Sequence, residues 1–176
     1  MKIETAEKKG PLWYAVYPSS LGDIFIAMGG SGITDLSVRT SEASFLEKME
    51  EKHKTPPSSG RSRFTGVFNE LDRYFSGKAV ELDLPLELSG SRFELKVWKV
   101  LKTIPYGVTR SYGWVACKAG KSLGARAVGG ACGANPAPII IPCHRVLRAD
   151  GSLGGYTGGV GIKRALLKIE GVEPKG

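Results

Sequence analysis

Side chains that bind metals or form disulfides are scarce in this sequence: its 176 residues include three cysteines and two histidines. An odd number of cysteines without a CxxC pair argues against a disulfide framework and against a zinc site, so we expect no metal and no other cofactor. No apolar stretch approaches the roughly 18 residues of a membrane span. Residues 1–4 lack the apolar core of a secretory signal. We therefore expect an intracellular, cytoplasmic protein with no membrane partner.

Negative charge is scarce in the second half of the chain. Residues 1–87 carry 11 Lys or Arg and 13 Asp or Glu, a formal charge of −2, whereas residues 88–176 carry 14 and 4, a formal charge of +10. A basic part beside a neutral one is typical of a polyanion-binding domain with an attached support domain. On charge alone, a lysine-rich solvated surface explains the asymmetry equally well.

The first half predicts a small antiparallel sheet with helices. Strand-like segments cover residues 13–17, 21–28 and 33–38, and glycines separate the second from the third. Residues 41–52 and 64–75 have the spacing of helices. We expect this α/β unit to occupy residues 1–87 as an N-terminal domain.

The second half, residues 88–176, predicts a mainly helical domain joined to the first by an extended bridge over residues 80–91. The expected helices cover residues 93–104, 111–119, 122–131 and 162–170. Two short helices joined by a glycine-containing turn indicate a helix-turn-helix. Residues 139–141, a run of three isoleucines, predict a short buried strand that delivers the residues after it to a candidate active site.

The second helix of the predicted helix-turn-helix has very small side chains. Between Gly124 and Gly133 the only large polar side chain is Arg126. Glycine is costly inside helices, so the composition needs a reason. Close approach of the helix to a flat surface and tight packing against another helix explain it equally well.

A nucleophile candidate follows the isoleucine run. Cys143 stands beside His144, and a cysteine needs a base or positive potential to become a thiolate. Side chains next to one another in an extended segment point to opposite sides, so His144 would reach Cys143 through a water. The pair alone is better explained by a surface histidine, and Cys117 and Cys132 by small buried hydrophobes.

Several motifs together resemble the O6-alkylguanine-DNA alkyltransferase family, in order over about residues 90–171. They are Ile104-Pro105-Tyr106-Gly107 with Ser111-Tyr112, Ala125-Arg126-Ala127-Val128-Gly129-Gly130, Asn135-Pro136, Ile141-Pro142-Cys143-His144-Arg145-Val146 and Gly155-Tyr156-Thr157-Gly158-Gly159. The joint pattern is highly specific. The first half resembles the family's variable N-terminal domain only loosely, through residues 71–77.

The resemblance implies catalytic roles. Cys143 is similar to the family's alkyl acceptor, and His144 to the water-mediated base that helps to make its thiolate. Glu170 matches the carboxylate that orients this histidine, which completes a relay like that of hydrolytic triads. Asn135 resembles the residue that braces the turn before the acceptor. Tyr112 matches the tyrosine that donates a proton toward N3 of the leaving guanine.

The resemblance also implies how DNA is held. Arg126 is similar to the finger that fills the stack after a base has flipped, on a helix that enters the minor groove. The expected DNA contacts are Ser111, Tyr112, Ala125, Arg126, Ala127 and Gly129. The expected pocket residues are Pro138, Val146, Tyr156, Thr157 and Gly158. The backbone of Cys143, Val146 and Thr157 would read the guanine edge.

The implied activity is a single, irreversible transfer from O6-alkylguanine in duplex DNA, with O4-alkylthymine a poorer substrate. The implied protein is a nucleoid-associated monomer. Position 157 is Thr where many relatives have Ser, residues 90–94 depart from the family pattern, and the zinc ligands of some N-terminal domains are absent. The alternatives are a non-catalytic helix-turn-helix protein, a lesion sensor, whose members lack the acceptor cysteine, and a cysteine hydrolase with repeated turnover.

Overall fold

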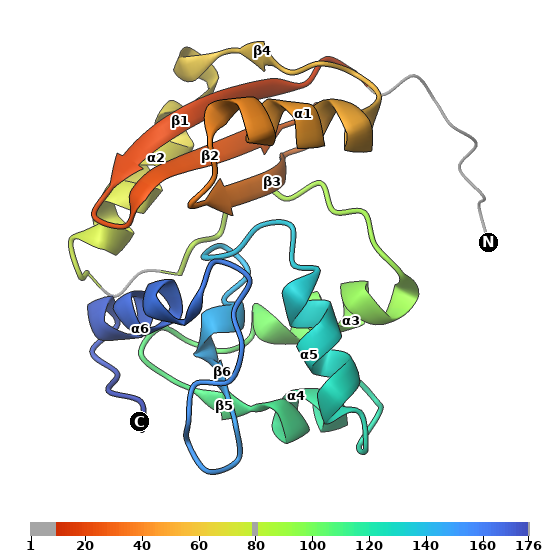
Figure 1. Ribbon diagram of the computed structural model, residues 1–176, viewed down its shortest axis with the longest axis vertical. Coiled ribbons are helices and arrows are strands. Elements are labelled where there is room, and N and C mark those ends of the chain that lie inside the picture. The colour runs from red at the N-terminus through yellow and green to blue at the C-terminus, as the bar shows by residue number, and fades with distance from the viewer. Residues whose placement is uncertain (1–9, 79–80, 176) are drawn as a thin grey trace.

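The computed structural model describes residues 10–78 and 81–175, and has the expected two-part α/β architecture (Figure 1). The expectations for residues 1–4 and for residue 80 lie outside the described residues. In the first part β1 (Trp13–Ser19), β2 (Gly22–Met28) and β3 (Ile33–Val38) pair antiparallel, as predicted. A short fourth strand that was not predicted, β4 (Ser58–Ser59), pairs parallel to β1, so the sheet is mixed, in the order β3-β2-β1-β4.

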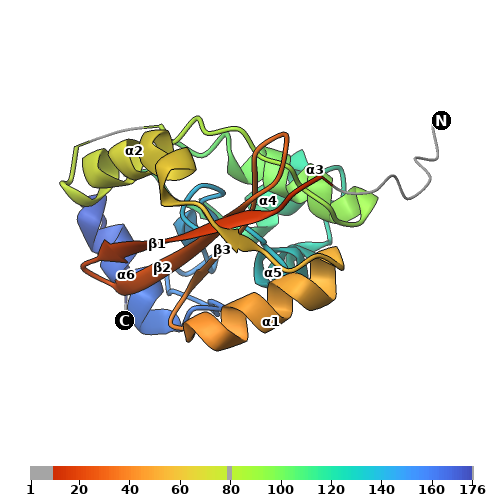
Figure 2. The same ribbon diagram turned by 90° about the horizontal axis from the view of Figure 1, so that it is seen from above.

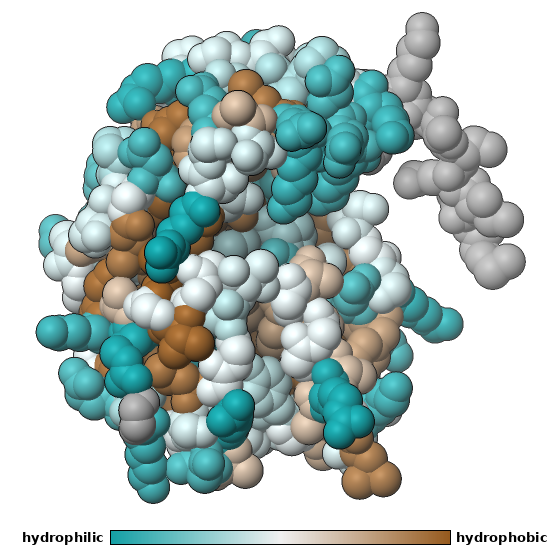
Figure 3. Space-filling view, viewed as in Figure 1, coloured by the Kyte–Doolittle hydropathy of each residue, from teal (hydrophilic) through white to brown (hydrophobic). Residues whose placement is uncertain are grey.

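Both faces of this sheet are covered, because β2 alternates its apolar side chains between them. Phe25 and Ala27 pack with Phe45 of helix α1 (Glu42–His53). Ile24 and Ile26 belong to the larger core on the other face. Helix α1 therefore closes the outer face, and its exposed side carries the hydrophilic side chains that gather over this part of the surface (Figure 3).

Helix α2 (Thr65–Phe75), which follows the 3-10 helix η1 (Arg61–Phe64), joins the larger core with the second part of the molecule. Figure 2 shows α1 and α2 on opposite sides of the strands. The larger core is continuous from the inner face of the sheet to the acceptor region, and it contains Cys143 as well as Ile24. A backbone hydrogen bond of 2.7 Å from Leu36 of β3 to the Pro136 carbonyl joins the two parts directly.

The second part is mainly helical and contains the expected helix-turn-helix. Helix α3 (Arg92–Leu101) begins with a capping box between Ser91 and Glu94. Helices α4 (Tyr112–Lys118) and α5 (Ala125–Gly133) form the pair. Helix α5 packs on α3, where Trp98 Nε1 donates to the Ala131 carbonyl at 2.8 Å. The last helix is α6 (Val160–Ile169).

Two local predictions in this part are wrong. Helix α5 begins at Ala125 rather than at Ser122, because the chain first makes a turn closed by a 2.7 Å hydrogen bond from the Gly124 amide to the Lys121 carbonyl. Residues 139–140 form a turn, and Ile141 makes only an isolated bridge with Pro138, so residues 139–141 are not a strand. Ile139 has a φ of 77° there, and the Ile141 amide donates back to the Ala137 carbonyl at 2.8 Å.

A buried apolar run is compatible with a strand or with a turn. The three isoleucines therefore led to the wrong prediction of a strand. The short strand at the site comes later, at β6 (Val146–Leu147), after the 3-10 helix η2 (Cys143–Arg145). It pairs parallel with β5 (Arg110–Ser111). This pairing places the start of α4 beside the segment that carries Cys143. Across the described ranges no helix is both long and apolar enough to cross a membrane.

Candidate active site

Cys143 is the first residue of η2 and is 4% exposed. Asn135 fixes it from the preceding turn. Its Nδ2 atom donates to the Ile141 carbonyl at 2.8 Å and to Cys143 Sγ at 3.1 Å, while its Oδ1 atom accepts from the Ala137 amide at 3.0 Å. One carboxamide therefore holds the turn and the thiol together.

His144 is completely buried, and its Nε2 lies 2.8 Å from Glu170 Oε1. A carboxylate can only accept a hydrogen bond, so Nε2 carries the proton of the neutral ring and Nδ1 presents a lone pair. Nδ1 has no hydrogen-bond partner among the described residues. Burial lowers the pKa of His144. The resting ring is therefore neutral and has one free basic nitrogen.

The extended geometry expected for Cys143 and His144 is wrong, because both lie in a 3-10 helix. No hydrogen bond joins the two side chains within the described ranges.

Arg145 completes this helix and pairs with Glu170, at the end of α6. Its Nε donates to the two carboxylate oxygens at 2.9 and 3.2 Å, and its Nη2 donates to Oε1 at 3.0 Å. Its Nη1 donates to the Ile104 carbonyl at 2.6 Å.

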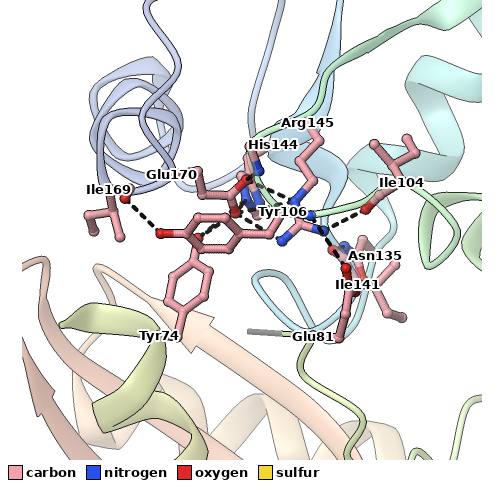
Figure 4. A network of polar contacts seen from close by, with 11 residues as sticks. Tyr74, Glu81, Ile104, Tyr106, Asn135, Ile141, His144, Arg145, Ile169 and Glu170 are labelled. Atoms are coloured by element: carbon pink, nitrogen blue, oxygen red, sulfur yellow. Dashed lines mark hydrogen bonds and ion pairs between the residues drawn. The ribbon is translucent and has the colours of Figure 1, made fainter. Parts of the chain in front are cut away.

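Glu170 is the centre of this buried network (Figure 4). Burial by itself would raise the pKa of Glu170, but the hydrogen bonds and charges of His144 and Arg145 outweigh burial and lower the pKa to about 2. The group is therefore a carboxylate at neutral pH. With Arg145 beside it, the pair is close to electrically neutral as long as His144 carries no proton.

The first part of the molecule adds one member to this network. The Tyr74 hydroxyl, from α2, donates to Glu170 Oε1 at 2.8 Å and lies 3.4 Å from His144 Nε2. Burial raises the pKa of Tyr74, so it stays a hydrogen-bond donor. The Gly107 amide donates to Glu170 Oε2 at 3.1 Å. Gly107 has a φ of 72°, and a Cβ there would lie 3.1 Å from the Glu170 carbonyl oxygen. This close turn requires glycine.

Burial raises the pKa of Cys143, while the amide of Asn135 and the charge of Lys163 oppose that rise. Lys163, on α6, is completely buried. Its ammonium group donates to the Val146 carbonyl at 2.6 Å and also to the Leu153 carbonyl. Burial lowers the pKa of Lys163 to about 8. The thiol thus faces one fixed cation but lies in a site that disfavours a permanent thiolate.

A cavity of about 560 Å³ opens from Cys143 toward the helix-turn-helix. Of the predicted DNA-contact residues, those that line it are Tyr112, Ala125, Arg126 and Gly129. Ala127 and Ser111 do not line it. The Ser111 hydroxyl caps α4 instead, where it accepts from the Trp114 amide at 3.1 Å. Arg126 is exposed and has no hydrogen-bond or ion-pair partner among residues 10–78 and 81–175.

Tyr112 is the first residue of α4, and its hydroxyl donates to the Gly155 carbonyl at 3.5 Å. Burial, followed by the charges of Cys132 and Cys143, raises the pKa of Tyr112 to about 12. The hydroxyl is therefore protonated at neutral pH, and the hydrogen bond that it donates to the Gly155 carbonyl is long. Its place in the cavity of Cys143 gives it access to a group bound there.

A second cavity of about 360 Å³ also reaches Cys143, between β3, α1 and the turn before the cysteine. The predicted pocket residues Tyr156 and Thr157 line both cavities, and Pro138 and Gly158 line the second. Val146 lines neither, because it is completely buried. The Tyr156 hydroxyl is buried and makes no hydrogen bond of ordinary geometry among the described residues, but it faces the Cys143 thiol, and burial together with that thiol raises the pKa of Tyr156.

The predicted residues Cys143, Asn135, His144 and Glu170 lie together in the structure, beside three buried neighbours to which the sequence gave no role. Arg145 stands inside the motif around the cysteine, and only its position next to His144 could have signalled its use. Tyr74 follows Leu71 at helical spacing, so it resembles a core residue. Lys163 looks like an ordinary surface lysine in the sequence. Across the described parts of the chain, no three His, Cys, Asp or Glu side chains cluster to bind a metal ion.

Comparison with known proteins places this chain in a family. The family model described as 6-O-methylguanine DNA methyltransferase, ribonuclease-like domain, matches residues 12–88, and the one for the DNA binding domain of the same family matches residues 92–172. A methylated-DNA--protein-cysteine methyltransferase of Mycobacterium tuberculosis is 44% identical over 157 residues, covering 89% of this chain and 91% of the relative.

A relative of the same name from Methanosarcina acetivorans is 38% identical over 162 residues, covering 91% of this chain and 99% of its own. The crystal structure of Mycobacterium tuberculosis OGT in complex with DNA superposes with a TM-score of 0.76 at 43% identity, covering 90% of this chain and 92% of that one. The sequence and the fold thus have counterparts over nearly the whole length of the chain. The chain belongs to the 6-O-methylguanine DNA methyltransferase family.

Proposed function

We propose that this protein repairs DNA by direct reversal, taking the alkyl group from O6 of guanine onto Cys143 in a single stoichiometric transfer. Family membership over both parts of the chain supports the activity. The observation that carries the assignment of the acceptor is the placement of Cys143 at the floor of a cavity beside α5, next to a buried histidine–carboxylate pair. A non-catalytic DNA-binding protein would not need this pair.

The proposed first step is formation of the thiolate. His144 Nδ1 takes the proton of Cys143 through a water, and the Glu170 carboxylate stabilises the resulting imidazolium. Because burial raises the pKa of Cys143, a permanent thiolate is disfavoured. Its negative charge is offset at the moment of attack by the new positive charge on His144 and by Lys163.

In the proposed second step the sulfur attacks the alkyl carbon. A sulfur–carbon bond forms, the carbon–O6 bond breaks, and its electron pair goes to the departing guanine. Guanine is a poor leaving group as an anion, so a proton donated by Tyr112 toward N3 eases its departure. The raised pKa of Tyr112, about 12, keeps that proton available at neutral pH. The thioether product is stable, and the protein reacts once.

DNA is the proposed partner, as a duplex that contains O6-alkylguanine, with O4-alkylthymine a weaker substrate. The lesion must leave the stack to reach a cysteine that is buried in the lining of this cavity. Arg126 fills the gap that it leaves, and Ala125, Ala127 and Gly129 let α5 approach the minor groove closely. Ser111 supports the same contact by capping α4. The protein acts as a monomer, associated with the nucleoid in a cytoplasm where its substrate lies.

The proposed pocket for the flipped base is lined by Tyr156, Thr157, Pro138 and Gly158, with the backbone of Cys143, Val146 and Thr157 at the guanine edge. The Val146 carbonyl already accepts from Lys163, so it would use its second lone pair for the base. We also propose that residues 1–87 and 88–176 are the two domains. The boundary falls close to the gap between the two family matches.

The test is an intact-mass measurement. The protein is incubated with a duplex containing O6-methylguanine, and we expect a gain of one methylene per molecule that stops at one. Cys143→Ser should abolish the gain and retain DNA binding, because a hydroxyl is a far weaker nucleophile at neutral pH. Cys117→Ser, at an exposed cysteine on α4, is the matched control and should behave as wild type. Transfer by Cys143→Ser would contradict the assignment.

A further inference from the structure

A second cysteine shares the cavities of the proposed acceptor. Cys132 lies in the last turn of α5, half-buried, and it lines both the cavity of about 560 Å³ and the cavity of about 360 Å³. Cys143 lines the same two cavities. No hydrogen bond engages the sulfur of Cys132 among the described residues. The third cysteine, Cys117, is exposed on α4 and lines neither cavity.

The electrostatics of the cavity agree with this arrangement. Burial raises the pKa of Cys132 to about 12, and the charge of Cys143 contributes to the rise while Lys163 opposes it. The charges of both cysteines also raise the pKa of Tyr112. Cys132, Cys143 and Tyr112 all line the cavity of about 560 Å³. At neutral pH Cys132 is a thiol, which leaves the first attack to Cys143 with its adjacent base.

We propose that Cys132 is a second covalent acceptor, which captures alkyl groups that carry another leaving group on their second carbon. The substrate class is O6-(2-haloethyl)guanine in DNA. The product is a protein in which a two-carbon bridge joins Cys132 to Cys143. This activity rests on the proposed function, because it begins with transfer to Cys143. It goes beyond that function because the reactive group is consumed inside the protein.

The chemistry balances in two displacements. First, Cys143 Sγ attacks the carbon bonded to O6, the carbon–oxygen bond breaks, and guanine leaves with a donated proton. The thioether sulfur then displaces the halide from the neighbouring carbon and forms a three-membered sulfonium ring, and the halide departs. Cys132 Sγ opens this ring by attacking a ring carbon, a second sulfur–carbon bond forms, and the thiol proton goes to solvent. No oxidant or reductant is needed.

The shared cavity favours Cys132 over competing nucleophiles. A sulfonium ring is a strong electrophile, so a neutral thiol can open it, and two groups held in one cavity react at a high effective concentration. A direct disulfide would need the two Cα atoms within roughly 7 Å and one narrow dihedral range. A bridge with two extra carbons reaches further and has two more rotatable bonds. Cys132 can thus close the bridge without the geometry that a disulfide requires.

The experiment uses the full chain and a duplex that contains O6-(2-chloroethyl)guanine. The mass of the intact protein separates three products: a bridge adds two carbons and two hydrogens, a hydrolysed adduct adds a hydroxyethyl group, and an unreacted adduct keeps its chlorine. Trypsin then reports the site. It releases residues 127–145 as one peptide that contains both Cys132 and Cys143, because no Lys or Arg lies between Arg126 and Arg145. Cys117 falls in a different peptide.

We expect the bridge as the main product, with no free thiol left in that peptide. Cys132→Ser should shift the product to the hydroxyethyl or chloroethyl adduct, or to a cross-link with DNA, whereas Cys117→Ser should form the bridge as wild type does. A wild-type adduct on Cys143 with a free thiol at Cys132 would overturn the proposal. A parallel duplex with O6-methylguanine separates the two hypotheses: absence of methyl transfer there would overturn the proposed function instead.

Discussion

Two arginines on either side of Cys143 have opposite environments. Arg145 is 4% exposed and makes three hydrogen bonds to Glu170 and one to the Ile104 carbonyl. Arg126 is exposed on α5 and has no hydrogen-bond or ion-pair partner in the described parts of the chain. Arg145 thus finds its charge partner and its hydrogen-bond acceptors within the protein. Arg126, on the side toward α5, leaves its guanidinium exposed to solvent.

The free-energy cost of keeping the charge in the folded protein differs between these two arginines. A buried charge is tolerated only when its partner and its hydrogen bonds are in place, so Arg145 and Glu170 depend on each other. An exposed arginine contributes little to folding but keeps its full ability to stack on a base or to bind phosphate. We therefore expect Arg145 to serve the folded state and Arg126 to serve the complex with DNA.

The largest expected effect is on folding. Arg145→Ala leaves the Glu170 carboxylate buried without its main partner and should lower the free energy of unfolding by about 3–5 kcal/mol. Arg126→Ala is the matched control and should stay within about 0.5 kcal/mol of wild type. Urea unfolding of the two variants measures both values. Equal losses would remove the distinction between the two arginines.

The next effect is a dependence on pH. The pKa of Glu170, about 2 in the folded protein, lies below that of an unfolded glutamate, so its contribution to stability is present above about pH 4.3 and is lost as the pH falls toward 2. Wild type should lose on the order of 2–3 kcal/mol more than Glu170→Gln across this interval. Parallel pH dependences for both proteins would show that Glu170 is not held ionised by its neighbours.

Glu170→Gln should also slow alkyl transfer more than it weakens DNA binding, because the imidazolium of His144 loses its counter-charge. The apparent pKa of the reactive thiol, measured as alkylation rate against pH, should rise. An unchanged rate profile would limit Glu170 to a structural role.

A smaller effect, on the rate of alkyl transfer, is expected for Arg126 on α5. Unstacking a base costs a few kcal/mol, and a stacked Arg126 should offset part of it. Arg126→Ala should therefore lower the rate on duplex DNA by about 10- to 100-fold, equivalent to about 1.4–2.8 kcal/mol. The rate with free O6-benzylguanine should change little, since a free base needs no flipping. Equal losses on both substrates would place Arg126 in the fold or the active site.

The smallest expected effect concerns the tyrosine of the first half. Tyr74→Phe removes one buried hydrogen bond to Glu170 and should lower the free energy of unfolding by about 1 kcal/mol. Tyr14→Phe removes a bond of similar length, 2.7 Å to Glu42 at an exposed position, and should cost less. Thermal or urea unfolding compares the pair. A larger cost for Tyr14 would show that burial is not what makes the contact of Tyr74 matter.

The periodicity of the sequence predicted most helices, because α2, α3 and α6 each bury one apolar face. It failed where local signals were ambiguous. Ser122 looked like a helix cap, but a turn through Gly124 comes first. The run at residues 139–141 was compatible with a strand, and its true shape depends on Asn135, several residues away. Strand β4 is two exposed serines, a pattern that carries no strand signal at all.

The sequence indicated some residues of the site and not others, for a related reason. Motif resemblance predicted residues that we propose to act on the substrate, such as Cys143, and gave no role to the buried residues that contact them. Glu170 lies 25 positions from Arg145 and 96 positions from Tyr74 in the chain. Contacts of that sequence separation arise from tertiary packing, which a single sequence does not display. The assignments to His144 and Arg126 remain predictions about chemistry.

The hydrogen bond from Tyr74 to Glu170 limits how the two halves of this protein can be recombined. A chimera that takes its sheet and α2 from one relative and its helix-turn-helix from another would have to bring a donor to this carboxylate. Without one, the buried carboxylate would lose a partner even if both halves folded well. A first half that provides no tyrosine at this position would therefore make an imperfect partner for this second half, and exchange between relatives should favour pairs that keep both ends of the bond.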